Sequence, residues 1–284
     1  MTEAEVLLGN LITDAGAMLA AARVPEPRRE ALRLWADLVE GSPVDAILGR
    51  RAPVSSEQVG EFLSAVERRA GGEPLAYVSG RAGFRRLTLG VDRRVLIPRP
   101  ETEGLVELVL THVSRGIVAD VCTGSACIAL SLADEGRYDH VLGVDLSADA
   151  LAVAAGNVRR TGLPVGLVRG DLTAPLATAS VDVLVANPPY IAPHEYAALD
   201  ASVLDWEPRM ALESGAEGLE TTERLLADGR RVVVPGGWIA LELDATRAAA
   251  TASVASASGW RHVTIHHDLF GRERYLLAQR SEIS

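Results

Sequence analysis

The chain has 284 residues, of which 48% are hydrophobic and 23% are charged, enough to bury the core of a full α/β domain and of a smaller partner domain. A formal net charge of −10 argues against a protein that grips a long stretch of phosphate backbone, so we expect no direct nucleic-acid binding. The acidic N-terminus lacks the basic region of a signal peptide, and no uncharged apolar stretch reaches membrane-spanning length. We therefore expect a cytoplasmic protein without a membrane partner, and we expect it to be a monomer.

Both cysteines, Cys122 and Cys127, lie in one short segment. Two thiols are too few for a disulfide scaffold or for the four ligands of a structural zinc site, and this fits a reducing cytoplasm. The histidines show no zinc-finger spacing. Because free cysteine is often simply buried, we interpret both as small buried thiols and predict no metal site.

The first 72 residues predict a small all-helical domain. Apolar residues recur at helical spacing over 3–23, 25–40 and 55–70, and a shorter helix is expected from Ser42-Pro43 to Leu48. Such a domain can cover apolar surface on a neighbour, or it can dock a substrate. The sequence favours neither reading strongly, and substrate docking by residues 1–72 is our working hypothesis.

Residues 73–99 predict a β-hairpin linker. Short strands are expected at Tyr77-Val78 and at 86–89, interrupted by nearby glycines. The hairpin is basic, with five arginines against two acids: Arg81, Arg85, Arg86, Arg93 and Arg94 against Glu73 and Asp92. A charge run of this kind is more often a solvated face than a binding patch.

Residues 100–284 predict alternating strands and helices. Pro100 opens a helix that extends to about Arg115, with acidic residues favourably placed in its first turn. Strands are then expected over 117–121, 140–145, 164–169, 181–186 and 236–243, with helices between them, and a final antiparallel pair over 260–267 and 274–279. This alternation predicts an α/β fold with a mostly parallel sheet and helices on both faces.

Three features at successive strand ends indicate a nucleoside site. The first is a loop of small residues, where backbone can approach a ligand closely: Cys122, Thr123, Gly124, Ser125 and Ala126. Asp145 ends the next strand, 21 residues after Gly124, near the spacing typical of an acid that binds ribose hydroxyls. Asp171-Leu172 follow the third strand and are placed to meet an adenine by polar and apolar contact.

The loop does not fit a dinucleotide, because Cys122 and Ala126 stand where G-x-G-x-x-G has its flanking glycines. A nucleoside without a pyrophosphate needs a less open turn, which indicates S-adenosylmethionine, with its sulfonium methyl group near Asn187. An ordinary strand-to-helix turn explains any one of the three features. It does not explain all three together with the motif that follows.

That motif is Asn187-Pro188-Pro189-Tyr190, at the end of the apolar strand 181–186. Asn187 offers a side-chain carbonyl and Pro188 a backbone carbonyl, and the prolines stiffen the corner, so two acceptors can converge on one –NH₂ group. Tyr190 offers a flat face on which a planar amide or base can stack. We predict that Asn187, Pro188 and Tyr190 are catalytic and that the four residues together bind the substrate.

Motifs shared with one known family run through nearly the whole chain. They are Gly72-Glu73-Pro74 with Tyr77 and Gly80, then 97–103, 120–128, Asp145, 187–190, Glu207-Pro208, Ala211-Leu212, Gly218-Leu219, Asp268, Gly271, Arg272 and Arg274. In this combination the chain resembles the HemK/PrmC glutamine methyltransferases, which methylate the glutamine of the Gly-Gly-Gln loop of bacterial peptide-chain release factors. Asn-Pro-Pro-Tyr alone is shared with DNA adenine methyltransferases.

The resemblance implies a Rossmann-like class I S-adenosylmethionine-dependent methyltransferase domain over residues 100–284, preceded by the small all-α domain. It implies that 122–126, Asp145, Leu172 and Asn187 contact the cofactor, and that 187–190 hold the substrate glutamine. One departure is Ala126, where the family usually has glycine. Its methyl group could crowd the methionine moiety or the helix start, and we expect at most a modest loss of cofactor affinity.

Three other functions compete with release factor methylation. A ribosomal-protein glutamine methyltransferase is separated from it only weakly by the sequence. A DNA or RNA adenine amino-methyltransferase could use the same acceptors on a flipped base, but the acidic charge balance argues against it. A non-catalytic adaptor would keep the fold, but the intact Asn187 and Asp145 argue against that.

Overall fold

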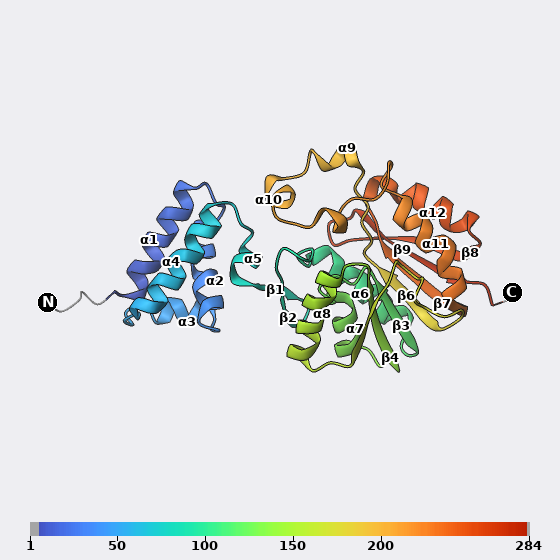
Figure 1. Cartoon of the computed structure of the whole chain (residues 1–284), viewed down its shortest axis with the longest axis horizontal. Coiled ribbons are helices and arrows are strands. Elements are labelled where there is room, and N and C mark those ends of the chain that lie inside the picture. The colour runs from blue at the N-terminus through green and yellow to red at the C-terminus, as the bar shows by residue number, and fades with distance from the viewer. Residues whose placement is uncertain (1–5, 283–284) are drawn as a thin grey trace. The chain divides into compact units, whose positions relative to one another are not determined.

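A computed structural model of the chain describes residues 6–282. The fold divides into two compact units, one that ends at Arg81 and one that begins at Ala82. Figure 1 shows the first as a group of helices and the second as a sheet with helices. In the part of the chain that the structure describes, no helix is long and apolar enough to cross a membrane.

The N-terminal unit is helical, as predicted. Its helices are α1 (Leu8–Ala21), α2 (Pro27–Leu38), α3 (Pro43–Leu48), α4 (Ser56–Ala70) and α5 (Leu75–Ser79). Ser42 and Ser55 cap α3 and α4 by accepting hydrogen bonds from the backbone N–H three residues on. Trp35 and Phe62 meet edge to face at 5.5 Å between ring centroids in the core of the unit. The first residues of the expected 3–23 helix, 3–5, lie outside the described residues.

The strand predicted at Tyr77-Val78 is wrong, because these residues belong to α5. Their aromatic and β-branched side chains suit a strand locally, but both are buried. The guanidinium group of Arg68 donates to the carbonyl oxygens of both residues, at 3.2 and 3.3 Å. Gly80, with a φ of 70°, ends the helix in the left-handed conformation that glycine tolerates. Tertiary burial therefore overrides the local preference.

The hairpin consists of β1 (Arg81–Phe84) and β2 (Leu87–Gly90). The turn residue Arg85 does not face solvent. Its guanidinium group lies 2.9 Å from Glu107 and binds Glu135 through two nitrogens, while its backbone N–H donates to Glu103. Arg86 next to it keeps 71% of its side chain exposed. The arginines of the basic run therefore differ in exposure. Arg85 is paired with carboxylates and fixes the hairpin to its own unit, whereas Arg86 is exposed.

Within the described residues, seven strands form one sheet in the order β5-β4-β3-β6-β7-β9-β8. The parallel strands are β3 (Ile117–Val121), β4 (His140–Asp145), β5 (Val165–Arg169), β6 (Val181–Ala186) and β7 (Val233–Glu242), and β8 (Trp260–His267) and β9 (Glu273–Arg280) form the antiparallel end. The predicted mostly parallel sheet with a C-terminal antiparallel pair is confirmed.

Helices cover both faces of this sheet (Figure 1). One core is closed by α6 (Pro100–His112), α7 (Cys127–Glu135) and α8 (Ala148–Thr161), and the other by α11 (Glu220–Val232) and α12 (Ala248–Ala257). Shorter helical turns, which the sequence pattern did not reveal, lie at α9 (Pro193–Tyr196), α10 (Ala201–Leu204), η1 (Arg209–Ala211) and η2 (Ala245–Arg247).

Candidate active site

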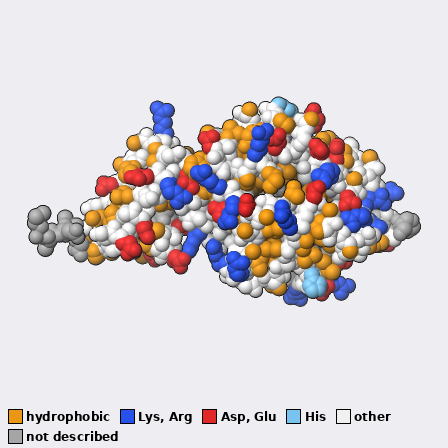
Figure 2. Space-filling model, in the orientation of Figure 1, with side chains coloured by type: hydrophobic (Ala, Val, Ile, Leu, Met, Phe, Trp, Pro, Cys, Tyr) orange, Lys and Arg blue, Asp and Glu red, His pale blue; other side chains and the backbone are white. Residues whose placement is uncertain are grey.

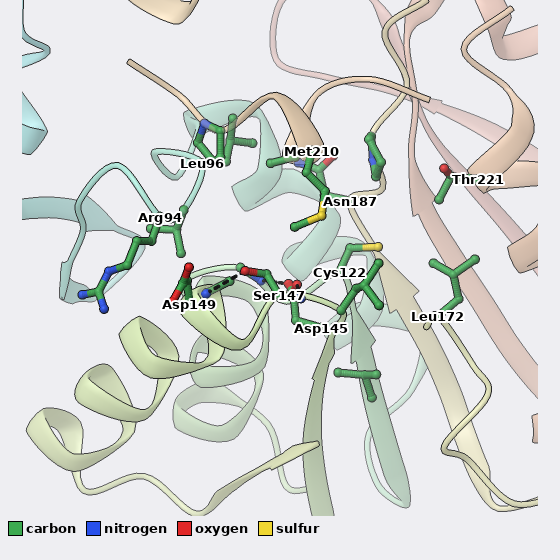
Figure 3. Close-up of a pocket in the computed structure, with 18 of the residues that line it drawn as sticks. Arg94, Leu96, Cys122, Asp145, Ser147, Asp149, Leu172, Asn187, Met210 and Thr221 are labelled. Carbon is green, nitrogen blue, oxygen red and sulfur yellow. Dashed lines mark hydrogen bonds between the residues drawn. The ribbon is translucent and has the colours of Figure 1, made fainter. Parts of the chain in front are cut away.

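A cavity of about 450 Å³ lies beyond the carboxyl ends of the parallel strands (Figure 3). The strand order reverses between β3 and β6, because the chain runs from β3 to β4 on one side and from β6 to β7 on the other. Open α/β sheets bind ligands at such a switch point. The cavity walls include residues from the loops after β3, β4, β5 and β6.

The loop after β3 contributes Cys122 and Gly124 to the cavity wall. Both have left-handed backbones, with φ of 64° and 54°, and a side chain added at Gly124 would meet nothing within 4 Å. Thr123, Ser125 and Ala126 are buried behind this wall. The structure thus places only two of the five predicted loop residues at the cavity surface, and the other three support them.

The buried carboxyl group of Asp120 fixes the loop through hydrogen bonds to Thr123 and Ala129. Its Oδ2 accepts hydrogen bonds from the Thr123 hydroxyl at 2.5 Å and from the backbone N–H of Ala129 at 3.1 Å. Its Oδ1 is buried without a partner among the described residues. Burial raises the pKa of Asp120 to about 7, and these two hydrogen bonds act in the opposite direction. The loop is therefore held by a carboxyl group whose ionised form is disfavoured by burial.

Asp145 lines the cavity at the end of β4. Its Oδ2 accepts from the backbone N–H of Gly124 at 2.9 Å, and its Oδ1 accepts from that of Ser147, also at 2.9 Å. The carboxylate therefore ties the β3 loop to the start of α8. Each oxygen has further lone pairs, so it can accept from a ligand hydroxyl as well.

Asp171 and Leu172, after β5, also line the cavity. Asp171 is half exposed and pairs with Arg224 of α11 at 2.6 Å. Leu172 takes a left-handed φ of 50°. An apolar side chain beside a paired carboxylate offers the mixed surface expected for a purine ring.

Of the Asn187 to Tyr190 motif, Asn187 and Pro189 line the cavity, and Pro188 is buried. Asn187 Nδ2 donates to the hydroxyl oxygen of Thr102, in the first turn of α6, at 3.2 Å. Tyr190 is half-buried, and burial raises the pKa of its phenol, so it stays neutral. The motif thus combines a polar side chain held at the cavity with a neutral aromatic ring nearby.

Other cavity residues were not predicted from the sequence to belong to the site, and Arg94 was named only as part of the basic hairpin. Arg94 and Leu96 come from the segment between β2 and α6, Met210 from η1, and Thr221 from α11 (Figure 3). They are far apart in the sequence. The only sequence signal that could have suggested them is that they lie next to family motifs such as 97–103. Buried Glu207 holds the segment between β2 and α6. It accepts hydrogen bonds from the backbone N–H of Ile97 at 3.2 Å and from the Arg99 side chain.

Counted from β3, the sheet order reads 3-2-1-4-5-7-6 with the last strand inserted antiparallel. This order, with a nucleoside-sized cavity at its switch point, defines a class I methyltransferase. Residues 101–217 match the family model described as "Methyltransferase small domain", and residues 10–80 match that of the "PrmC N-terminal domain". The fold is also that of a methyltransferase from Pyrococcus furiosus, with a TM-score of 0.51 and 18% identity, over 80% of this chain and 100% of that one.

Curated relatives are similar over nearly the full length. The release factor glutamine methyltransferase of Nitratidesulfovibrio vulgaris is 37% identical over 96% of this chain and 95% of its own. That of Moorella thermoacetica is 39% identical over 97% of this chain and 99% of its own. The chain belongs to the release factor glutamine methyltransferase family, which confirms the resemblance seen in its motifs.

Proposed function

We propose that this enzyme transfers a methyl group from S-adenosylmethionine to the side-chain nitrogen of the glutamine in the Gly-Gly-Gln motif of peptide-chain release factors. The observation that carries the proposal is the position of Asn187, which lines the nucleoside-sized cavity and follows the β6 strand directly. Both cysteines are free thiols, as expected in a reducing compartment, and a cytoplasmic site of action is part of the proposal.

The cavity residues fit S-adenosylmethionine better than a dinucleotide. Three backbone N–H groups of the β3 loop already have acceptors: Thr123 donates to Val144 O, Gly124 to Asp145, and Ala126 to Thr123 O. A pyrophosphate would need such groups free. The open space beside Gly124 instead lets a part of a ligand without phosphate groups lie close to the backbone. We assign the cofactor to the β3 loop 122–126, Asp145 on the ribose, Asp171 and Leu172 on the adenine, and Asn187 near the methionine part.

When bound, the cofactor supplies an electrophilic methyl group on its sulfonium. We assign the protein's contribution to positioning. The side-chain oxygen of Asn187 and the carbonyl of Pro188 accept the two N–H bonds of the substrate amide, Pro189 stiffens the corner, and Tyr190 stacks on the amide plane. Holding both N–H bonds directs the nitrogen lone pair, and orientation of this kind can be worth roughly 7–11 kcal/mol. No strong base is required, since the methylated nitrogen becomes acidic and loses its proton to water.

We further propose that residues 1–72 dock the release factor, with residues 73–99 as the linker to a methyltransferase domain over 100–284. Helix α3 supports this, because three apolar side chains spaced along one face are exposed: Val44 by 60%, Ile47 by 52% and Leu48 by 78%. An apolar helix face that the described residues of its own unit leave uncovered suits a protein partner.

A nucleic-acid substrate is disfavoured by the distribution of charge. Basic and acidic side chains are interspersed on the face shown in Figure 2. Several cavity-side arginines are already neutralised by carboxylates, such as Arg94 by Asp92 and Arg224 by Asp171, both at 2.6 Å. A phosphate backbone would have to compete with these pairs.

The proposal is tested by methyl transfer from labelled cofactor to purified release factor, ribosomes and DNA in parallel. Label is expected in the release factor, and label only in ribosomes or DNA would refute it. Asn187→Ala should lower kcat by ~10²–10³ at saturating cofactor, the scale for losing one preorganised polar partner of a developing charge. A near wild-type kcat for that variant would mean that the motif is a structural turn.

A further inference from the structure

The amide of Asn187 can serve its proposed role only in one orientation. Its Oδ1 accepts from a substrate N–H, whereas an Nδ2 turned toward the substrate would oppose donor to donor. In the structure Nδ2 donates to Thr102 Oγ1 at 3.2 Å, and no hydrogen bond from the described residues occupies Oδ1. The oxygen is thus free for a ligand.

Glu242 lies beside Asn187 as a consequence of strand register. Ala186 of β6 pairs with Leu241 of the parallel strand β7, so the next residue of each strand emerges at the same edge of the sheet. Glu242 is 2% exposed, and its Oε2 has no hydrogen-bond partner among the described residues. Thr102, also 2% exposed, accepts a hydrogen bond from Asn187 Nδ2 and is close enough to Glu242 to lower the pKa of that carboxyl group.

Burial raises the pKa of Glu242 to about 7, and hydrogen bonding to Thr102, the positive charge of Arg274 and hydrogen bonding to Asn187 act in the opposite direction. Above neutral pH the carboxylate is therefore ionised and can only accept hydrogen bonds. An inverted Asn187 amide would set its Oδ1 against this buried carboxylate, acceptor against acceptor.

We propose that Glu242 and Thr102 are positioning residues that fix the Asn187 amide, with its nitrogen turned inward and its oxygen toward the substrate nitrogen. Nδ2 has two protons, one for the Thr102 hydroxyl oxygen and one for the Glu242 carboxylate. The Thr102 hydroxyl is then free to donate its own proton to the carboxylate. This inference rests on the proposed function, because it assigns Glu242 no contact with the substrate and lets it act only through Asn187.

The test is a double-mutant cycle at pH 8, with kcat measured on release factor at saturating cofactor. Glu242→Gln keeps the volume and removes the charge, and it should lower kcat about tenfold, on the order of one lost hydrogen bond to a charged group. Cofactor Kd and the KM for release factor should change less than kcat. In an Asn187→Ala background the same substitution should have no further effect.

An equal fall in both backgrounds would show that Glu242 acts elsewhere, and no fall in the wild-type background would also overturn the inference. If Glu242→Gln does not fold, Thr102→Val, which removes the hydroxyl at constant shape, replaces it in the same cycle with the same expectation.

A second measurement does not depend on activity. In ¹⁵N-labelled protein, the side-chain –NH₂ protons of Asn187 should exchange slowly with solvent, and Glu242→Gln or Thr102→Val should speed that exchange. Fast exchange in the wild type would refute the inward nitrogen. If wild-type enzyme does not methylate release factor, the proposed function fails, while this measurement still decides the orientation of Asn187.

Discussion

Asp145→Ala should weaken cofactor binding by removing the acceptor that we assign to the ribose hydroxyls. A hydrogen bond to a charged group contributes about 1.5–3 kcal/mol, and each 1.4 kcal/mol changes Kd about tenfold, so Kd should rise roughly 10- to 150-fold. The structure adds a second effect. Both carboxylate oxygens accept backbone N–H groups, from Gly124 and from Ser147, so the variant should also lower Tm.

The two effects can be separated by changing the ligand instead of the loop. Calorimetry would compare S-adenosylhomocysteine with its analogue lacking the 2′-hydroxyl, on wild type and on Asp145→Ala. Wild type should lose affinity for the analogue, and the variant should bind both ligands equally. Asp149, another acid that lines the cavity, supplies the control, because Asp149→Ala removes the same charge and should keep the preference for the hydroxyl.

Equal losses for the analogue in wild type and in Asp145→Ala would refute the ribose assignment, whatever the affinity of the variant. Asp145→Asn is no gentler probe here. Its –NH₂ group would face one of the two backbone N–H groups, donor against donor, so we expect it to be about as damaging as alanine.

Three further predictions concern stability and docking. Arg85→Ala should lower Tm by leaving Glu135 without its close partner, whereas its exposed neighbour Arg86→Ala should change Tm little, and equal Tm values would contradict the ion-pair cluster. Because the pKa of Asp120 is raised, the folded state holds its proton more tightly, and stability without cofactor should fall as pH rises from about 4 to about 7. Asp120→Asn should therefore raise Tm more at pH 8 than at pH 5, and an equal rise in Tm at both pH values would rule out this role of Asp120. Ile47→Glu should raise the KM for release factor with kcat and Tm unchanged, while the same charge introduced on exposed α1 by Ala17→Glu should not, and equal KM values would leave α3 without a docking role.

The strands of the large sheet and the longer helices were predictable because the pattern that specifies each of them is local. Strands of the parallel sheet are continuous apolar runs such as 181–186, and capping serines such as Ser55 mark helix starts. The spatial order of the strands is set by which apolar faces pack together, and no single segment encodes it. The segment Tyr77-Val78 failed for the same reason, since burial in the helical unit decides its conformation.

The site was predictable at strand ends and not elsewhere. Asn187 follows one apolar strand and Asp145 ends another, so their edge of the sheet could be inferred. Thr102 is 85 residues from Asn187 in sequence, and Arg85 is 50 from Glu135, so these contacts exist only after folding. A basic run therefore looked like one surface, although its turn residue Arg85 is bound to carboxylates within its own unit.

The β3 loop shows what a sequence departure means physically. Ala126 takes a φ of 65°, fully buried, where glycine would adopt the same conformation without a Cβ clash, and the left-handed conformation costs a non-glycine residue roughly 1–2 kcal/mol. The methyl group therefore raises the conformational energy of the backbone where α7 begins, whether or not it touches a ligand. Asp120 adds a second cost, because it is a buried carboxyl group whose Oδ1 has no hydrogen-bond partner among the described residues. A loop that persists despite both must be determined by the packing around it, and strain of this kind is found where a chain shapes a binding site.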